Sequence, residues 1–516
     1  MRPAYPTDPA EGRCDADAFE VRDPRDGRVR ARHRDATADD VRAAVDRARR
    51  QGAWWAAQGF AARRTYLDTW RRLMVNRSDE LVELIRSETG KTPDDARLEA
   101  VLVAEHLHWA ARNAHRVLRP RRVRPGLLMA NHAAHVEHHP LGVVGVIGPW
   151  NYPAFIPLGP IAHALAAGNA VVFKPSEHTP AVGRWLADTF AEATAGHRVV
   201  EVVLGRGATG EALCRSGVDK LAFTGSTRTG RRVMAACADT LTPVLLECGG
   251  KDALLVDRDA AVAQAADAAL WGAVANAGQT CVGVERVYVH EAVADAFLTE
   301  LTTRAAALRT GPGPEADFGP LVTPDQPAVV ARHIQDALDR GARAIVGGSH
   351  SVRGPFAAPV VLTDVPDTAL AATDETFGPV VVVERVASMT EAVERANACA
   401  YGLGASVFSR RRGTELARRL RVGMVSVNSV LAFAAIPALP FGGTGASGFG
   451  RVHGAEGLKE FSRTQAVARR RFPLPVQPLS FDRPPWAMTA LTRLVATVRG
   501  GRPGHPRPNA PAQEPR

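Results

Sequence analysis

The chain has 516 residues, more than a single hydrophobic core usually supports, so we expect two or more domains. Its 46% hydrophobic and 23% charged residues are typical of a globular protein and exclude wholesale disorder. The net charge of +10 comes largely from arginines at 112–124, at 469–471 and after 483, with no interleaved aromatic stacking platform, which favours a solvated basic surface over a nucleic-acid partner.

The six cysteines are too widely spread for a zinc site, and a chain of this size does not need disulfides. We therefore expect reduced thiols, no metal and a cytoplasmic protein. The first twenty residues include acidic side chains, Asp8 and Glu11 among them, and no apolar core, unlike a secretory signal. No run approaches the roughly 18 apolar residues of a membrane span.

The N-terminal part is predicted to be a hairpin followed by a helical layer. Within residues 21–36, short apolar stretches interrupt the charged residues, a pattern typical of an edge hairpin. From residue 37 to about residue 117 apolar side chains recur at helical spacing, and Thr37 and Asp39 are placed to cap the first helix.

Residues 119–139 interrupt this pattern and carry four histidines, which are His132, His135, His138 and His139. A histidine cluster is a candidate metal site. Small and polar neighbours alternate here, however, and no Cys or Asp lies at ligand spacing, so we favour a solvent-facing hairpin.

From residue 141 short apolar runs alternate with helical stretches. The predicted buried strands are 143–147, 170–174, 199–204, 221–224 and 244–247. The predicted helices between them are 156–167, 180–195, 209–216 and 229–238. This alternation predicts an α/β fold with a parallel, doubly wound sheet that binds its ligand at the carboxyl ends of the strands.

Two of these strand ends carry residues suited to a dinucleotide. Lys174 and Glu177 follow the second strand and can address ribose hydroxyls, although an ordinary surface loop has the same composition. A carboxylate there repels a 2′-phosphate, which favours NAD over NADP. Gly225 and Ser226 open a helix after the fourth strand, where a glycine and free backbone N–H groups suit a pyrophosphate.

The second half, about residues 251–440, repeats the alternation, so we expect a second α/β domain. Its predicted strands are 253–256, 286–289, 343–347, 380–384, 405–408 and 424–427.

Three further stretches carry candidate chemistry. Cys281 ends the run Asn-Ala-Gly-Gln-Thr-Cys at a helix-to-strand junction, Glu247 ends a predicted strand, and Asn151 lies in Gly-Pro-Trp-Asn-Tyr-Pro. A free thiol is mostly protonated at neutral pH and needs a base. Together these stretches resemble the aldehyde dehydrogenase superfamily, over about residues 21–472.

The resemblance implies how the chain is organised. It gives a Rossmann-like NAD-binding domain at 1–121 and 141–249 and a catalytic domain at 250–442. A small β arm at 122–140 and 463–475 is expected to join subunits into a homodimer or homotetramer.

The resemblance also implies roles. Cys281 adds to an aldehyde, and the Asn151 amide and the Cys281 backbone N–H stabilise the oxyanion. Hydride then leaves to NAD, and Glu247 activates the water that hydrolyses the thioester. The remaining cofactor contacts are expected from Trp150, Glu375 and Phe377.

The expected substrate pocket is lined by Tyr152, Ile156, Leu431 and Phe433. These side chains are apolar apart from one phenol and offer no cation to a second carboxylate, which favours an aliphatic or aromatic aldehyde. The alternatives are a CoA-acylating enzyme, a succinate-semialdehyde dehydrogenase, or a catalytically retired relative with a structural role.

The tail at 476–516 departs from the compact family core. Residues 486–499 predict an amphipathic helix whose apolar face is formed by Ala487, Leu491, Leu494, Val495 and Val498. With arginine at its polar positions, this helix is expected to dock on an anionic membrane, as a peripheral contact, or on the protein or a neighbouring subunit. The Pro-rich residues 502–516 are expected to be disordered.

Overall fold

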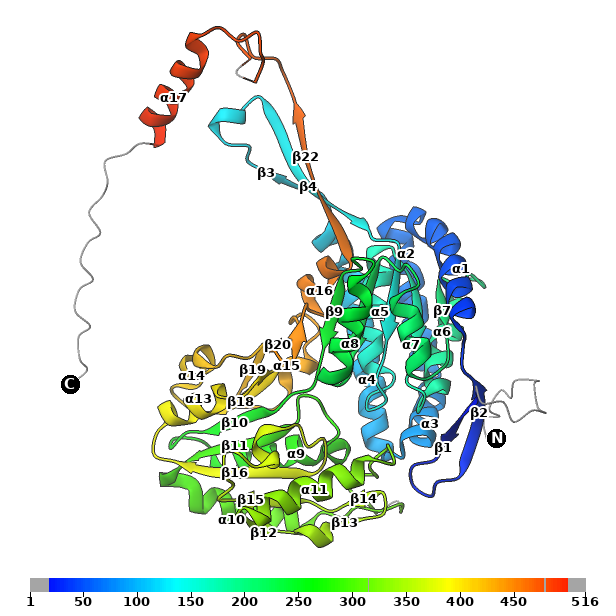
Figure 1. Cartoon of the computed structure of the whole chain (residues 1–516), viewed down its shortest axis with the longest axis vertical. Coiled ribbons are helices and arrows are strands. Elements are labelled where there is room, and N and C mark those ends of the chain that lie inside the picture. The colour runs from blue at the N-terminus through cyan, green and yellow to red at the C-terminus, as the bar shows by residue number, and fades with distance from the viewer. Residues whose placement is uncertain (1–17, 314, 478, 500–516) are drawn as a thin grey trace. The chain divides into compact units, whose positions relative to one another are not determined.

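The computed structural model describes residues 18–313, 315–477 and 479–499. The described residues up to Arg119 and those from His138 to Thr464 form a first compact unit. Those of Pro120–Glu137 and from Gln465 onward form a second. Figure 1 labels the elements of both units. Cys14 and the expected disordered tail lie outside the described residues.

The first unit begins with an antiparallel hairpin and four helices. The bounds are β1 (Ala18–Arg22), β2 (Val29–Arg34), α1 (Ala38–Ala57), α2 (Gly59–Asn76), α3 (Ser78–Thr89) and α4 (Pro93–Leu118). Thr37 caps α1, because its side chain accepts from the Asp40 backbone N–H while the Asp40 carboxylate accepts from the Thr37 N–H.

A six-stranded sheet follows, with the order β21-β9-β8-β5-β6-β7. Its strands are β5 (Val143–Ile147), β6 (Ala170–Lys174), β7 (Val200–Val202), β8 (Lys220–Thr224), β9 (Val244–Glu247) and β21 (Gly448–Phe449). The connecting helices are α5 (Phe155–Ala167), α6 (Pro180–Ala193), α7 (Gly207–Cys214) and α8 (Thr227–Ala238). All pairings are parallel except that of β21 with β9.

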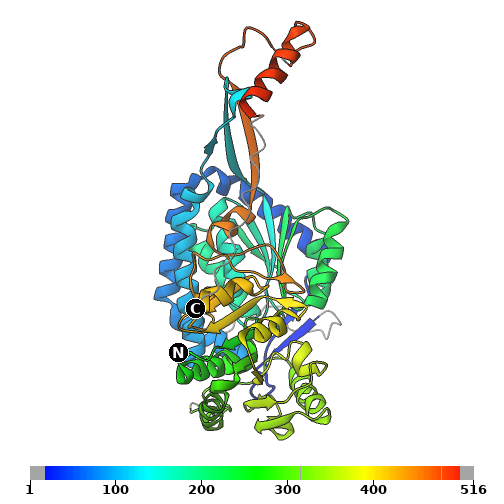
Figure 2. The same ribbon diagram turned by 90° about the vertical axis from the view of Figure 1, so that its left-hand side faces the viewer.

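The strand order reverses between β5 and β8. After β5 the chain forms β6 and β7 on one side of this strand, whereas β8 and β9 lie on its other side. Helices consequently cover both faces of the sheet (Figure 2). The loops after β5 and β8 diverge at this point and leave the crevice in which doubly wound sheets bind ligands.

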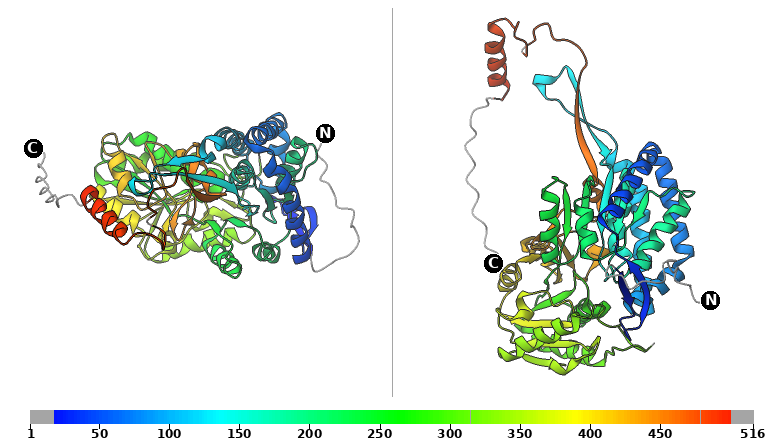
Figure 3. Two further views of the ribbon diagram at one scale, coloured as in Figure 1. Left: turned by 90° about the horizontal axis from the view of Figure 1, so that it is seen from above. Right: turned by 45° about the vertical axis from the view of Figure 1, so that its right-hand side comes forward.

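The second sheet of the first unit has seven strands, in the order β12-β15-β16-β11-β10-β18-β19, parallel except for β12. The strands are β10 (Asp252–Val256), β11 (Val284–His290), β12 (Arg343–Val346), β15 (Val360–Thr363), β16 (Val380–Val386), β18 (Gly404–Phe408) and β19 (Met424–Val427). Its helices are α9 (Val262–Val274), α10 (Glu291–Ala307), α11 (Gln326–Asp339), α13 (Met389–Asn397) and α14 (Gly413–Arg419). Figure 3 shows this sheet from two further directions.

Short elements complete the first unit. They are η2 (Ala275–Gly278), η3 (Ser349–Ser351), β13 (Val352–Arg353), β14 (Phe356–Ala357), α12 (Leu370–Thr373), β17 (Tyr401–Gly402), α15 (Ala432–Ala435), β20 (Thr444–Gly445) and α16 (Gly454–Glu460). The structure therefore has the mixed α/β architecture, with two mainly parallel sheets, that the alternation predicts.

The second unit is built on β3 (Arg121–Val123), η1 (Leu127–Met129), β4 (His132–Pro140) and β22 (Ser462–Arg470), in a three-stranded sheet of order β22-β4-β3. Residues 486–499 form α17 (Trp486–Arg499). Asn131 ties the chain after β22 to the hairpin, since its Nδ2 donates to the Phe472 carbonyl (3.1 Å) and its carbonyl accepts from the Arg471 N–H (2.8 Å). None of the helices in the described part has the length and apolar character needed to span a bilayer.

Candidate active site

The carboxylate of Glu247 lies at the carboxyl end of β9. The parallel register pairs Glu247 with Thr224 at the end of β8, and the Gly225 N–H donates to the Glu247 carbonyl (3.0 Å). Thr224 Oγ1 donates to Glu247 Oε2 (3.3 Å), while the buried Oε1 has no hydrogen-bond partner within the described chain. Burial raises the pKa of Glu247 to about 8. The hydrogen bond from Thr224 lowers this pKa, but by less than burial raises it.

Cys281 is carried by an irregular segment between α9 and β11. Asn276, Ala277 and Gly278 have φ angles of 55°, 57° and 72°, so three consecutive residues adopt the left-handed conformation. A Cβ on residue 278 would lie 2.2 Å from the Gly378 backbone, so only glycine fits there. This segment turns the chain out of the helix and toward the cavity.

The Gln279 side chain holds this segment from inside. It is fully buried, and its Nε2 donates to the carbonyls of Asn276 (3.0 Å) and Pro320 (3.1 Å). Its Oε1 accepts from the Val322 N–H (2.8 Å). Gln279 was not among the predicted site residues, although it lies in the same run as Cys281, two residues before it.

Asn151 reaches the same segment from the loop after β5. Its side-chain Nδ2 donates to the Gln279 backbone carbonyl (3.0 Å), and its backbone carbonyl accepts from Asn276 Nδ2 (3.0 Å). These bonds fix the Asn151 amide beside the Cys281 segment. An amide nitrogen carries two hydrogens, and one of them is engaged by Gln279.

One cavity of about 300 Å³ is lined by all three residues of the expected catalytic trio. Trp150, Glu375 and Phe377 also line it, with the rings of Trp150 and Phe377 edge to face at 5.6 Å. Burial raises the pKa of the Cys281 thiol, and the carboxylates of Glu247 and Glu375 raise it further. The resting cysteine is therefore a thiol that needs a base before it can react.

Glu375 is positioned by two glycines and a buried charge network. It accepts from the Gly250 N–H (3.0 Å), and a Cβ on Gly249 would lie 2.0 Å from its Oε2. Burial raises its pKa to about 8. Glu285 accepts from the backbone N–H of Thr376 and of Phe377 (3.0 Å) and is paired with Lys251.

Neither partner of that pair was among the predicted site residues. Glu285 lies inside a strand and Lys251 just before one, where a buried charge is unusual.

A second cavity of about 820 Å³ contains the other expected cofactor residues. Lys174, Glu177, Gly225 and Ser226 line it, and Lys174 Nζ lies 3.5 Å from the Glu177 carboxylate. Ser226 caps α8 by accepting from the Thr229 N–H (3.3 Å), which leaves a helix N-terminus at the cavity wall. Arg232, which the sequence analysis did not select, lies in the same wall.

The two cavities share lining residues, which are Pro149, Trp150, Thr224, Gly225 and Ser226. They therefore form one continuous cleft along the carboxyl ends of β5, β6, β8 and β9. The cleft offers a carboxylate, a helix N-terminus and small residues, which are features suited to a dinucleotide.

The four expected substrate-pocket residues occupy three environments. Ile156 lines the smaller cavity. Leu431 and Phe433 belong to an apolar cluster against which Cys281 packs, together with Val282, Leu403, Met424 and Phe441. Tyr152 donates or accepts a hydrogen bond with Thr280 Oγ1 (2.8 Å) and has Lys91 Nζ over its ring (3.9 Å), so it contacts the residue before Cys281.

Comparison with known proteins gives a consistent result. The family model described as aldehyde dehydrogenase family matches residues 12–467. A protein of Mycolicibacterium smegmatis that bears the name succinate-semialdehyde dehydrogenase (NADP+) is 39% identical, with 90% of this chain and 91% of the relative covered. The 4,4'-diapolycopene aldehyde oxidase of Methylomonas sp is 38% identical, with 88% and 86% covered.

A solved structure gives the same answer for the fold. The NAD-dependent aldehyde dehydrogenase of Sinorhizobium meliloti is 32% identical and superposes with a TM-score of 0.85, covering 90% of this chain and 93% of the other. The chain belongs to the aldehyde dehydrogenase family.

Proposed function

We propose that the protein oxidises an apolar aldehyde to the carboxylic acid, with NAD as the hydride acceptor and Cys281 as the nucleophile. One observation carries this proposal: Cys281, Glu247 and Asn151, more than 100 residues apart at the extremes, line a single cavity that opens into the dinucleotide cleft.

Each residue has a defined step. The Glu247 carboxylate takes the thiol proton, the Sγ–carbon bond forms, and the Asn151 amide and Cys281 backbone N–H donate to the resulting oxyanion. Bound NAD supplies the acceptor for the hydride that leaves this adduct as it becomes a thioester. Glu247 gives up this first proton to solvent and then takes a proton from water, whose oxygen attacks the thioester. The acid is released as the C–S bond breaks, and Glu247 returns its proton to the departing Cys281 sulfur.

An apolar substrate is supported by the cavity wall. None of the described residues lining the smaller cavity is Lys, Arg or His, and the charged groups that act on Cys281 are carboxylates. A substrate with a second carboxylate would meet repulsion rather than a cation. The name of the mycobacterial relative makes succinate semialdehyde the second candidate.

A panel of aldehydes decides between them. We expect kcat/KM to rise from propanal to longer and aromatic aldehydes, and to be lowest for succinate semialdehyde. A preference for succinate semialdehyde would contradict the proposal. Product formation without added CoA distinguishes hydrolysis from acylation, and Glu247 supports hydrolysis.

The preference for NAD over NADP rests on Glu177, whose carboxylate lies in the expected ribose region of the cleft. Arg215 and Arg232 are the arginines in the same wall that would favour a 2′-phosphate. Initial rates with each cofactor at saturating aldehyde test the assignment, and a higher kcat/KM for NADP would overturn it.

A homodimer or homotetramer in the cytoplasm completes the proposal, with the β3, β4 and β22 sheet as the joining arm. Light scattering coupled to gel filtration tests the assembly, and a mass of one chain would contradict it. Cell fractionation tests the location.

A further inference from the structure

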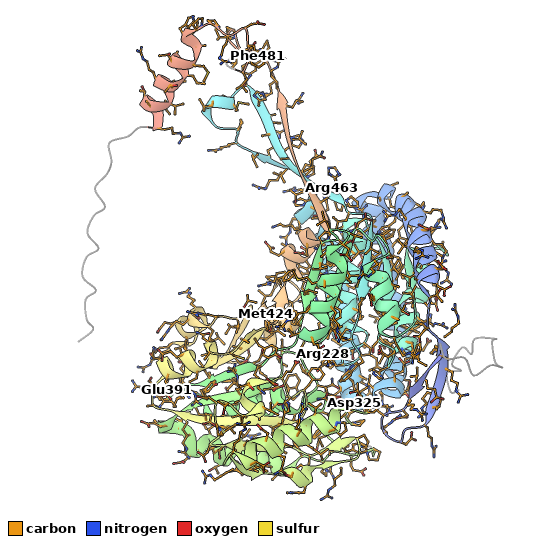
Figure 4. All side chains as sticks on the ribbon, in the orientation of Figure 1. Arg228, Asp325, Glu391, Met424, Arg463 and Phe481 are labelled. Carbon is orange, nitrogen blue, oxygen red and sulfur yellow. The ribbon has the colours of Figure 1, made fainter. Side chains whose placement is uncertain are left out.

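The second unit exposes many large apolar side chains on a small amount of chain. Those that are more than a third exposed are Leu128, Met129, Phe472, Leu479, Phe481, Trp486, Met488, Leu494 and Val498. Phe481, labelled in Figure 4, is fully exposed, and Leu479 is 88% exposed. Singly exposed apolar residues are ordinary, but such a group within one small unit indicates an interaction surface.

α17 and the tip of the hairpin form this surface together. On α17, Ala487 is buried and Leu491 and Val495 are half-buried, whereas Leu494 and Val498 remain 46% and 49% exposed. A hollow of about 280 Å³ is lined by the helix residues Leu494, Val495, Val498 and Arg499 and by Pro125, Gly126, Leu128 and Met129 of the hairpin. The apolar side of α17 and the hairpin tip therefore face one shared hollow. We call the residues that line this hollow the apolar rim.

The second unit, which contains the apolar rim, is rich in arginine, and Arg499 lines the hollow itself. The described residues of the second unit contain nine arginines and two acidic residues, an excess of seven positive charges. The arginines are Arg121, Arg122, Arg124, Arg469, Arg470, Arg471, Arg483, Arg493 and Arg499. On the helical wheel, Arg493 and Arg499 flank the apolar arc of α17 on its two sides.

We propose that the apolar rim and its arginines dock the protein on an anionic phospholipid bilayer. The arginines pair with lipid phosphates, while the exposed apolar side chains enter the boundary between headgroups and acyl chains. A nucleic acid offers phosphates but no apolar layer for Phe481, Trp486 and Leu494.

This inference does not depend on the proposed catalytic function, since it concerns a different unit of the chain. It adds a consequence to that function, because apolar aldehydes partition into bilayers and a docked enzyme would be close to them.

Co-sedimentation of the full-length protein with vesicles tests the proposal. We expect binding to phosphatidylcholine vesicles that contain about one third phosphatidylglycerol, and at least tenfold weaker binding to phosphatidylcholine alone or in high salt. Absence of binding to the anionic vesicles would overturn the proposal. The Cys281→Ala variant should bind as the wild type does, which separates this test from that of the catalytic mechanism.

Two sets of variants locate the surface. The apolar set is Trp486→Gln, Leu494→Gln and Val498→Gln, and the charge set is Arg483→Gln, Arg493→Gln and Arg499→Gln. Each set should weaken binding to the anionic vesicles about tenfold or more. The matched apolar control is Met234→Gln with Leu241→Gln, at positions 51% and 87% exposed in the first unit. The matched charge control is Arg42→Gln, Arg198→Gln and Arg343→Gln.

Three outcomes would contradict the proposal. In the first, the control sets weaken binding as much as the test sets do. In the second, the apolar set changes the oligomeric mass and leaves vesicle binding unchanged, which would make the rim an interface between copies. In the third, duplex DNA displaces the vesicles and only the charge set weakens binding, which would make the surface a general polyanion site.

Discussion

Glu247 and Cys281 line the same cavity, but the protein positions them by different means. Glu247 ends a regular strand, where the parallel register with β8 fixes its backbone. Cys281 ends a segment with three left-handed residues and depends on side-chain hydrogen bonds from Gln279 and Asn276. Glu247 is therefore held by backbone pairing, and Cys281 by buried amides.

This difference has a consequence for substitutions. Removing a side chain near Glu247 leaves the strand ladder intact, so effects should be local and chemical. Removing a buried amide near Cys281 leaves backbone groups unpaired and releases the segment, so the nucleophile moves.

The largest effect is expected from the nucleophile itself. Cys281→Ala should lower NADH production by roughly 10⁴-fold or more, because the proposed covalent adduct forms on its sulfur. NAD binding, measured by calorimetry, should remain within a few-fold of wild type. Cys248→Ala is the matched control, since this buried thiol lies next to Glu247 and should be dispensable. Equal losses of NADH production in the two variants would show that Cys281 is not the nucleophile.

Glu247→Gln should lower steady turnover by roughly 10²- to 10⁴-fold while preserving the fold, since the amide keeps the size of the side chain. Stopped-flow fluorescence should show any residual NADH as a burst no larger than the number of active sites, followed by a slow phase. Turnover close to wild type would show that another group is the base.

The pH profile sharpens this assignment. A carboxylate with a pKa of about 8 is protonated below that pH and cannot accept a proton, so deacylation in the wild type should rise as pH increases through about 8. The rising limb should be absent in Glu247→Gln. If the limb persists unchanged in the variant, it belongs to a different group.

Gln279→Ala tests the buried amide that holds the cysteine segment. Three hydrogen bonds are lost, and a displaced nucleophile should lower turnover by roughly 10- to 100-fold, with the cavity still able to bind NAD. Gln335→Ala is the control. This glutamine is exposed, and its side chain forms hydrogen bonds with two other exposed side chains, those of Asp339 and Ser349. A Gln279→Ala enzyme as active as the control would show that the backbone alone holds Cys281.

The smallest effect is expected at the far end of the cleft. Glu177→Ser should raise the ratio of kcat/KM for NADP to that for NAD by roughly tenfold, because the repulsion of a 2′-phosphate is removed. Glu211→Ser changes another carboxylate in the same cavity wall and should leave the ratio unchanged. The same shift in both variants would indicate a general charge effect rather than a ribose contact.

Local patterns in the sequence were sufficient for most of the parallel framework. The runs at 143–147, 170–174 and 244–247 coincide with β5, β6 and β9, since buried strands are continuous apolar segments bounded by polar turns. β21 has only two residues and pairs with β9 across some 200 residues of chain, so no local pattern could identify it. β15 was also missed, although Val360–Thr363 is a short apolar run after a proline.

The sequence by itself determined the family and the main parallel strands, and it supplied the reactive groups that we propose, because these depend on residue type and periodicity. Only the tertiary structure decided that Gln279 fills the space behind Cys281, that Glu285 holds the segment before Phe377, and that α17 shares a hollow with the hairpin tip. These features depend on contacts between residues distant in the chain, and the burial that gives Glu247 its raised pKa arises in the same way.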